Sequence, residues 1–131
     1  PRDFVLVARA DGVMTGSYDI AEARARLADF ETAGADCLYS PLPPSLADIA
    51  ALCAATRLPV NALAAGPCTK VTRAGFAEAG VARISLGSAL ARATHRTIRD
   101  AAQAMFDAGD FSRLGGMSGD EVDALLARGA G

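Results

Sequence analysis

Four short apolar segments, separated by stretches with helical periodicity, constrain the fold of this chain more than any other feature. They cover residues 4–8, 36–39, 58–63 and 82–87. Their nearly continuous apolar character is typical of strands covered on both faces, as in a parallel sheet. Strands that alternate with helices predict βα units, and so an α/β fold.

The stretches between these segments carry the helical pattern. Ile20, Ala23, Leu27 and Phe30 recur at spacings of three or four residues, and Gly34 follows them. This pattern predicts a helix that ends at the glycine. A second helix is predicted to begin after Ser45, which is its N-cap, and a third covers residues 71–79. A fourth runs from after Ser88 to Gly109, and a last one covers residues 119–126.

Four βα units added in one direction correspond to half of a closed barrel. Parallel crossovers are right-handed in nearly all cases, so every helix would lie on one face of the sheet and leave the other face bare. Eight such units close a barrel in about 250 residues, and this chain has 131. We therefore expect a single partial domain over residues 1–131. The strands and intervening helices lie in residues 1–87, and the long last helix and a tail in residues 88–131.

Composition argues against several classes of partner. Lys and Arg number 13 against 15 Asp and Glu, giving a net charge of −2. A chain with this charge balance lacks the basic surface that binds nucleic acids or anionic membranes. No run of 18 apolar residues is present, and the opening residues do not resemble a secretory signal. Three cysteines at wide spacing do not form a disulfide framework, so we expect a cytoplasmic protein.

Polar residues at or inside the predicted strands are the candidates for chemistry. Arg9 follows the first apolar segment, where a guanidinium can bind a carboxylate or phosphate with two parallel hydrogen bonds. The alternative is a structural ion pair with Asp11 or with another acid at the barrel mouth. Asp11 itself could hold Arg9 or act as an acid or base. Asn61 lies inside the third segment, where its amide could orient a carboxylate or simply hold a strand-end loop.

Weaker candidates lie at other strand ends. Ser40 ends the second strand, where a turn is the alternative. Gly87 and Ser88 lie between the last predicted strand and the helix that follows it. The N-terminus of that helix could bind an anion, or Ser88 could simply be its N-cap. His95 has no partner at metal-ligand spacing and is expected at the surface or an interface. Cys37, Cys53 and Cys68 are expected to be buried apolar side chains, and no metal-ligand cluster is visible.

Four sequence stretches, in order, resemble the isocitrate lyase/phosphoenolpyruvate mutase family. They are FVLVARAD at residues 4–11, AGADCL at 33–38, LPVN at 58–61 and GVARISLGS at 80–88. The resemblance covers nearly the whole chain. It implies strands five to eight, the C-terminal half of a TIM-type (β/α)8 barrel, with a long terminal helix.

The resemblance also implies a chemistry. Family members cleave or form C–C or P–C bonds next to a carboxylate through enolate-like species stabilised by Mg²⁺, and many exchange the last barrel helix with a neighbouring subunit. Arg9 matches the substrate-binding arginine after the fifth strand. Asn61 matches a polar position after the seventh strand that contacts substrate in the lyases.

This chain departs from the family pattern in three places. Residues 39–42 read YSPL where the isocitrate and methylisocitrate lyases carry a Pro-Glu pair. The loop after Asn61 lacks the Asn-x-Thr pattern of methylisocitrate lyase. The family's Mg²⁺-binding acids and its Cys-Gly-His lid loop belong to the first half of the barrel, and nothing in this chain replaces them.

Two functions remain open from the sequence. The first is part of a Mg²⁺-dependent lyase or phosphonomutase that acts on a small α-oxo or 2-hydroxy acid or a phosphonate. Its ligands for Mg²⁺ would lie in the other half of the barrel, and it would form a homo-oligomer by exchanging its last helix. The isolated chain is then expected to be inactive. The alternative is a catalytically inactive half-barrel that oligomerises as a binding or structural module.

Overall fold

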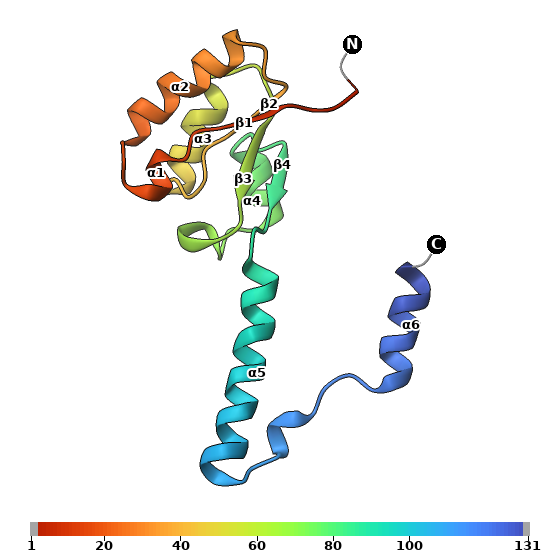
Figure 1. Ribbon diagram of the computed structural model, residues 1–131. Helices are drawn as coiled ribbons and strands as arrows, with labels where there is room; N and C mark the ends of the chain where they lie inside the picture. Colours follow the sequence, from red (N-terminus) through yellow and green to blue (C-terminus); the bar gives the residue numbers. More distant parts are fainter. Residues whose placement is uncertain (1–2, 130–131) are drawn as a thin grey trace. The chain divides into compact units, whose positions relative to one another are not determined.

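Four parallel strands lie side by side in chain order (Figure 1). The computed structural model describes residues 3–129, which form two compact units that divide between Ala89 and Leu90. The first unit holds the whole sheet, ordered β1-β2-β3-β4. The predicted α/β fold of parallel βα units is thereby confirmed. The strands are β1 (Val7–Arg9), β2 (Cys37–Tyr39), β3 (Val60–Leu63) and β4 (Arg83–Ser85).

Side-chain caps fix where the connecting helices begin. Asp19 caps α2 (Ile20–Thr32) by accepting a hydrogen bond from a backbone N–H of the first turn. Ser45 caps α3 (Leu46–Ala54) in the same way, as predicted from the sequence. Thr72 caps α4 (Arg73–Glu78), and for this reason α4 is shorter than the predicted 71–79.

All three of these helices cover the same face of the sheet. Leu38 and Val60 are register partners on β2 and β3, and they share a core with Leu27 of α2 and Leu52 of α3. Ala62 lies two residues beyond Val60 and therefore points to the same side. It packs in a second core with residues of α3 and α4, namely Ile49 and Phe76.

The strands are shorter than the apolar segments that predicted them. The first segment was expected to form a strand over residues 4–8, but β1 begins only at Val7. Val7 pairs with Cys37, the first residue of β2, so no strand residue lies opposite the chain before Val7. Phe4, Val5 and Leu6 accordingly expose 65%, 69% and 42% of their surface. The length of the partner strand sets this boundary.

Short helices that the sequence did not predict complete the first unit. They are the single-turn α1 (Gly12–Thr15), directly after β1, and η1 (Gly66–Cys68), after β3. Each is too short to leave a periodic pattern.

The second unit is built from the long helix α5 (Ala89–Ala108), the turn η2 (Ser112–Leu114) and α6 (Gly119–Gly129). The bounds of α5 agree with the predicted helix. Ala101 is the one buried side chain on α5, and α6 has none among its described residues. Within residues 3–129, no helix has both the length and the apolar character needed to cross a membrane.

Candidate functional site

Arg9, Tyr39 and Asn61 form one row across the face of the sheet opposite α2, α3 and α4. Arg9 pairs with Tyr39 in the β1–β2 register, and Tyr39 pairs with Asn61 in the β2–β3 register. Because Leu38 and Val60 point to the helices, their neighbours Tyr39 and Asn61 point to the opposite face. Arg9 and Tyr39 are also the last residues of their strands. The carboxyl ends of parallel strands are where βα barrels carry their sites.

Arg9 is held by three neighbours at this edge. Its Nε donates a hydrogen bond to Oδ1 of Asp11. Its guanidinium carbon lies 5.2 Å from the centre of the Tyr39 ring, and its Nη2 lies 3.9 Å from Sδ of Met14. The side chains of Arg9 and Asp11 are 46% and 50% exposed. A pair this exposed contributes little stability, so its main effect is to orient the guanidinium.

Asn61 belongs to a different network, centred on Ser85. Its Nδ2 donates to the Ser85 hydroxyl at 2.9 Å, and that hydroxyl donates its single proton to the carbonyl of Ala62 at 3.2 Å. Because the Ser85 hydroxyl donates its proton to Ala62, it can only accept a hydrogen bond from Asn61. The amide of Asn61 must therefore turn its Nδ2, and not its Oδ1, toward Ser85. Asn61 is 3% exposed, and its Oδ1 is buried without a hydrogen-bond partner among residues 3–129. Unpaired buried acceptors are rare in folded proteins.

The weaker candidates lie at the ends of β2 and β4. The buried Ser40 hydroxyl donates to the carbonyl of Ala10 at 3.3 Å and so joins the ends of β1 and β2. Gly87 has φ +53°, and an added Cβ would lie 3.3 Å from Cδ1 of Leu63. Ser88 is exposed directly before α5. The structure thus brings Arg9 and Asp11 together and gives Ser40 and Asn61 partners of their own.

The loop after β2 has an unusual backbone conformation. Leu42 has φ +52°, a left-handed conformation that is uncommon for a residue other than glycine. Pro41 is fully buried before it, and Pro43 is buried after it. Cδ2 of Leu42 would lie 3.0 Å from a Cβ added to Gly66, so the loops after β2 and β3 touch at this point.

The titratable groups of the described residues do not form a metal centre. Within residues 3–129, no group of three or more His, Cys, Asp or Glu comes together. These residues therefore do not fit the Mg²⁺ ion that the resemblance implies. Cys37 and Cys68 are buried and Cys53 is half-buried. Burial raises the pKa of the Cys53 and Cys68 thiols, which makes them poor nucleophiles at neutral pH. His95 is exposed on α5.

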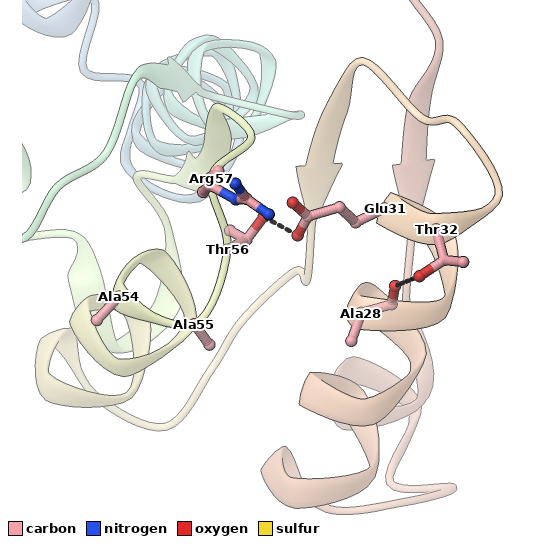
Figure 2. Close-up of a pocket in the computed structure, with 7 residues that line it drawn as sticks. All are labelled: Ala28, Glu31, Thr32, Ala54, Ala55, Thr56 and Arg57. Carbon is pink, nitrogen blue, oxygen red and sulfur yellow. Dashed lines mark hydrogen bonds between the residues drawn. The ribbon is translucent and has the colours of Figure 1, made fainter.

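A polar pocket of about 540 Å³ lies at the other end of the sheet, where α2 and α3 end and the chain turns into β2 and β3. Figure 2 shows the contact that crosses it, a hydrogen bond of 2.5 Å from the Thr56 hydroxyl to Oε2 of Glu31. The same hydroxyl accepts a hydrogen bond from the N–H of Leu58 at 3.0 Å. Both contacts join neighbouring βα units, as expected for the face of a βα fold that supports stability.

Tyr39, Met14 and Ser85 are the contacts that the sequence analysis missed. Tyr39 is visible in the sequence as the last residue of a strand, but its contact with Arg9 depends on the β1–β2 register. Met14 belongs to the unpredicted helix α1. Ser85 reaches Asn61 across 24 residues of sequence.

The chain is similar to proteins of known fold over nearly its whole length. The family described as phosphoenolpyruvate phosphomutase matches residues 1–106. A protein from Burkholderia cenocepacia J2315, provisionally described as a lyase/mutase, is 33% identical with a TM-score of 0.88. The alignment covers 97% of this chain and 46% of that protein, so the chain spans about half of its length. No curated protein sequence matches the chain.

Two further structures agree. A protein from the same organism, provisionally described as a phosphonomutase, is 34% identical with a TM-score of 0.65, over 77% of this chain and 42% of its own. Oxaloacetate acetylhydrolase in complex with its product oxalate is 25% identical with a TM-score of 0.67, over 84% of this chain and 38% of its own. The resemblance drawn from the sequence is confirmed: this chain belongs to the phosphoenolpyruvate phosphomutase family.

Proposed function

We propose that this chain supplies the carboxylate-binding part of a lyase or mutase that acts on a small α-oxo or 2-hydroxy acid or a phosphonate. The observation that carries the proposal is Arg9, an exposed guanidinium at the carboxyl end of β1, oriented by Asp11 and Tyr39. The similarity to oxaloacetate acetylhydrolase, whose structure holds the dicarboxylate oxalate, supports the same class of ligand.

Arg9 binds the anionic group of the substrate in this proposal. Two parallel hydrogen bonds from a guanidinium fix both the position and the plane of a carboxylate. The C–C or P–C bond next to that carboxylate is then held in one place relative to the other reacting groups. Asn61 assists from the next-but-one strand, and Asp11 orients Arg9. Ser40, Gly87 and Ser88 shape the surrounding loops.

The remaining groups of the active site lie outside this chain in our proposal. The described residues hold no cluster fit for Mg²⁺, so its ligands would come from the other half of the barrel. The isolated chain should then show no turnover of oxaloacetate in the presence of Mg²⁺. Robust metal-dependent turnover by the purified 131-residue chain would contradict this division of roles.

Arg9→Lys in the complete enzyme tests the role of Arg9. Lysine keeps the charge but loses the planar pair of donors. We expect kcat/KM to fall at least about tenfold, which corresponds to about 1.4 kcal/mol of transition-state binding. Unchanged kinetics would mean that Arg9 is only a structural ion pair.

Arg26→Lys is a matched control. Arg26 also pairs with a carboxylate, that of Glu22 at 2.9 Å, and also stacks on a tyrosine, with its guanidinium carbon 4.7 Å from the Tyr18 ring. It lies on α2, however, outside the row of Arg9. The control should therefore leave kcat/KM unchanged.

A further inference from the structure

The contacts of Arg9 leave one pair of its donors for a ligand. A guanidinium has five N–H donors, one on Nε and two on each terminal nitrogen. Nε donates to Asp11, and Nη2 faces Sδ of Met14 at 3.9 Å. These contacts use Nε and, at the long distance of a sulfur contact, one N–H of Nη2. Both N–H groups of Nη1 and the second N–H of Nη2 take no acceptor from residues 3–129, and so the Nη1–Nη2 end can face a carboxylate.

The three neighbours of Arg9 differ in how firmly they are held. Asp11 lies in the segment after β1 and is half exposed. Met14 belongs to the single-turn helix α1. Tyr39 belongs to the sheet, because it pairs with Arg9 on one side and with Asn61 on the other, and its carbonyl accepts from the N–H of Ala10 at 2.9 Å. Tyr39 is therefore the most rigid of the three.

A single bond to Asp11 allows the guanidinium to swing about that bond. The Tyr39 ring lies against the guanidinium, with 5.2 Å between the guanidinium carbon and the ring centre. Attraction between a cation and the face of an aromatic ring opposes such a swing. We infer that Tyr39 is a positioning residue that aims the Nη1–Nη2 end of Arg9 at the carboxylate of the ligand.

This inference rests on the proposed function of Arg9 and makes a distinct prediction about Tyr39. The aromatic ring is required, and the hydroxyl is not. Tyr39→Phe should therefore bind carboxylates like the wild type. Tyr39→Leu should bind them more weakly, because the guanidinium loses the ring that limits its motion.

The test measures binding of oxalate to the complete enzyme by titration calorimetry. We expect Tyr39→Leu to weaken the Kd about two- to fivefold, the range of an exposed cation–π contact. Tyr39→Phe should stay within twofold of wild type. Tyr39→Met, a ring-free side chain of similar length, replaces Tyr39→Leu if the latter fails to fold, as judged by thermal unfolding.

A double-mutant cycle with Arg9→Gln shows whether Tyr39 acts through Arg9. In the Arg9→Gln background, the loss caused by Tyr39→Leu should disappear. A loss that persists there would overturn the positioning role. A defect in Tyr39→Phe equal to that in Tyr39→Leu would also overturn it, because the hydroxyl would then contact the ligand.

The same titrations separate this inference from the proposed function. If the wild type does not bind oxalate, or if Arg9→Gln binds it as the wild type does, the proposed function of Arg9 fails. If Arg9→Gln binds oxalate more weakly than the wild type while Tyr39→Leu binds it as the wild type does, only the role of Tyr39 fails.

Discussion

Asn61 donates a hydrogen bond from Nδ2 to the hydroxyl of Ser85, 2.9 Å away on the neighbouring strand. Since Ser85 in turn donates to the carbonyl of Ala62, three polar groups form one chain on the face of the sheet that the helices leave bare. The arrangement turns the Oδ1 of Asn61 into a buried acceptor that meets no donor among the described residues. An acceptor that is buried without a donor stays in this position only if the other hydrogen bonds of the network hold the Asn61 side chain there.

Ser85→Ala should destabilise the first unit. The change removes the acceptor for Nδ2 of Asn61 and the donor to Ala62 at once. Leaving partly buried polar groups unpaired costs about 1–3 kcal/mol. We expect the free energy of unfolding in urea to fall by that amount. Ser17→Ala is the control, because the exposed Ser17 hydroxyl also has a hydrogen bond, to Thr15 at 2.8 Å. Equal effects of the two changes would rule out a special role for Ser85.

Thr56→Val should loosen the contact between two βα units. The Thr56 hydroxyl bonds both to Glu31 and to the N–H of Leu58, and valine keeps the shape without the hydroxyl. We expect a loss of about 1–2 kcal/mol in the free energy of unfolding. Thr32→Val is the matched control in the same pocket, because the Thr32 hydroxyl bonds only within its own helix, to the carbonyl of Ala28 at 3.0 Å. A loss no larger than that of the control would refute the role of this contact.

The sequence predicted the elements whose evidence is local. Apolar runs and helical spacing gave the βα order, and Ser45 was recognisable as an N-cap. The limits of β1 were wrong because they depend on where β2 begins. The contacts of Arg9 with Tyr39 and of Asn61 with Ser85 depend on strand register, which joins residues 30 and 24 positions apart. No local pattern records such a register, so these contacts required the structure.

The start of α6 should depend on pH. The N–H and hydroxyl of Ser118 donate to Oε2 of Glu121 at 2.8 and 2.9 Å, and the N–H of Glu121 donates to the Ser118 hydroxyl at 3.3 Å. This is a capping box. The hydrogen bonds from Ser118 lower the pKa of Glu121 below its ordinary value of 4.5. Ionised Glu121 therefore stabilises the start of α6 at pH values above its ordinary pKa. This stabilisation is lost as the pH falls through the lowered pKa of the folded state.

Residue-resolved ¹³Cα shifts of α6 provide the measurement. We expect them to move toward coil values as the pH falls below 4.5. Glu121→Gln should abolish the pH-dependent step, because glutamine does not titrate. Asp120→Asn, in the same first turn, should retain it. A step that survives in Glu121→Gln would assign the titration to another group. Asp110 also has a lowered pKa, through hydrogen bonds from Ser112, but it lies outside α6.

The long helix α5 should mediate association of the chain. At about 1.5 Å per residue its 20 residues span about 30 Å. Leu90, Ile98 and Phe106 expose 67%, 65% and 86% of their surface. By the helical period, Ile98 lies on the apolar side with Met105 and Phe106, and Gln103 lies on the polar side. Exposed apolar surface of this kind is typical of sites of protein–protein contact, and we propose a second copy of this chain as its partner.

Light scattering at micromolar concentration should therefore report at least a dimer. Ile98→Asp should shift the distribution toward monomer, because it places a charge within the apolar stripe. Gln103→Asp adds the same charge on the polar side and should leave the distribution unchanged. The sheet face that carries Arg9 is not covered by α2, α3 or α4, and it offers a second surface for association. If Ile98→Asp remains fully associated, that face or the unpaired edges of β1 and β4 hold the copies together. A stable monomer with sharp thermal unfolding would show instead that this chain needs no partner at either surface.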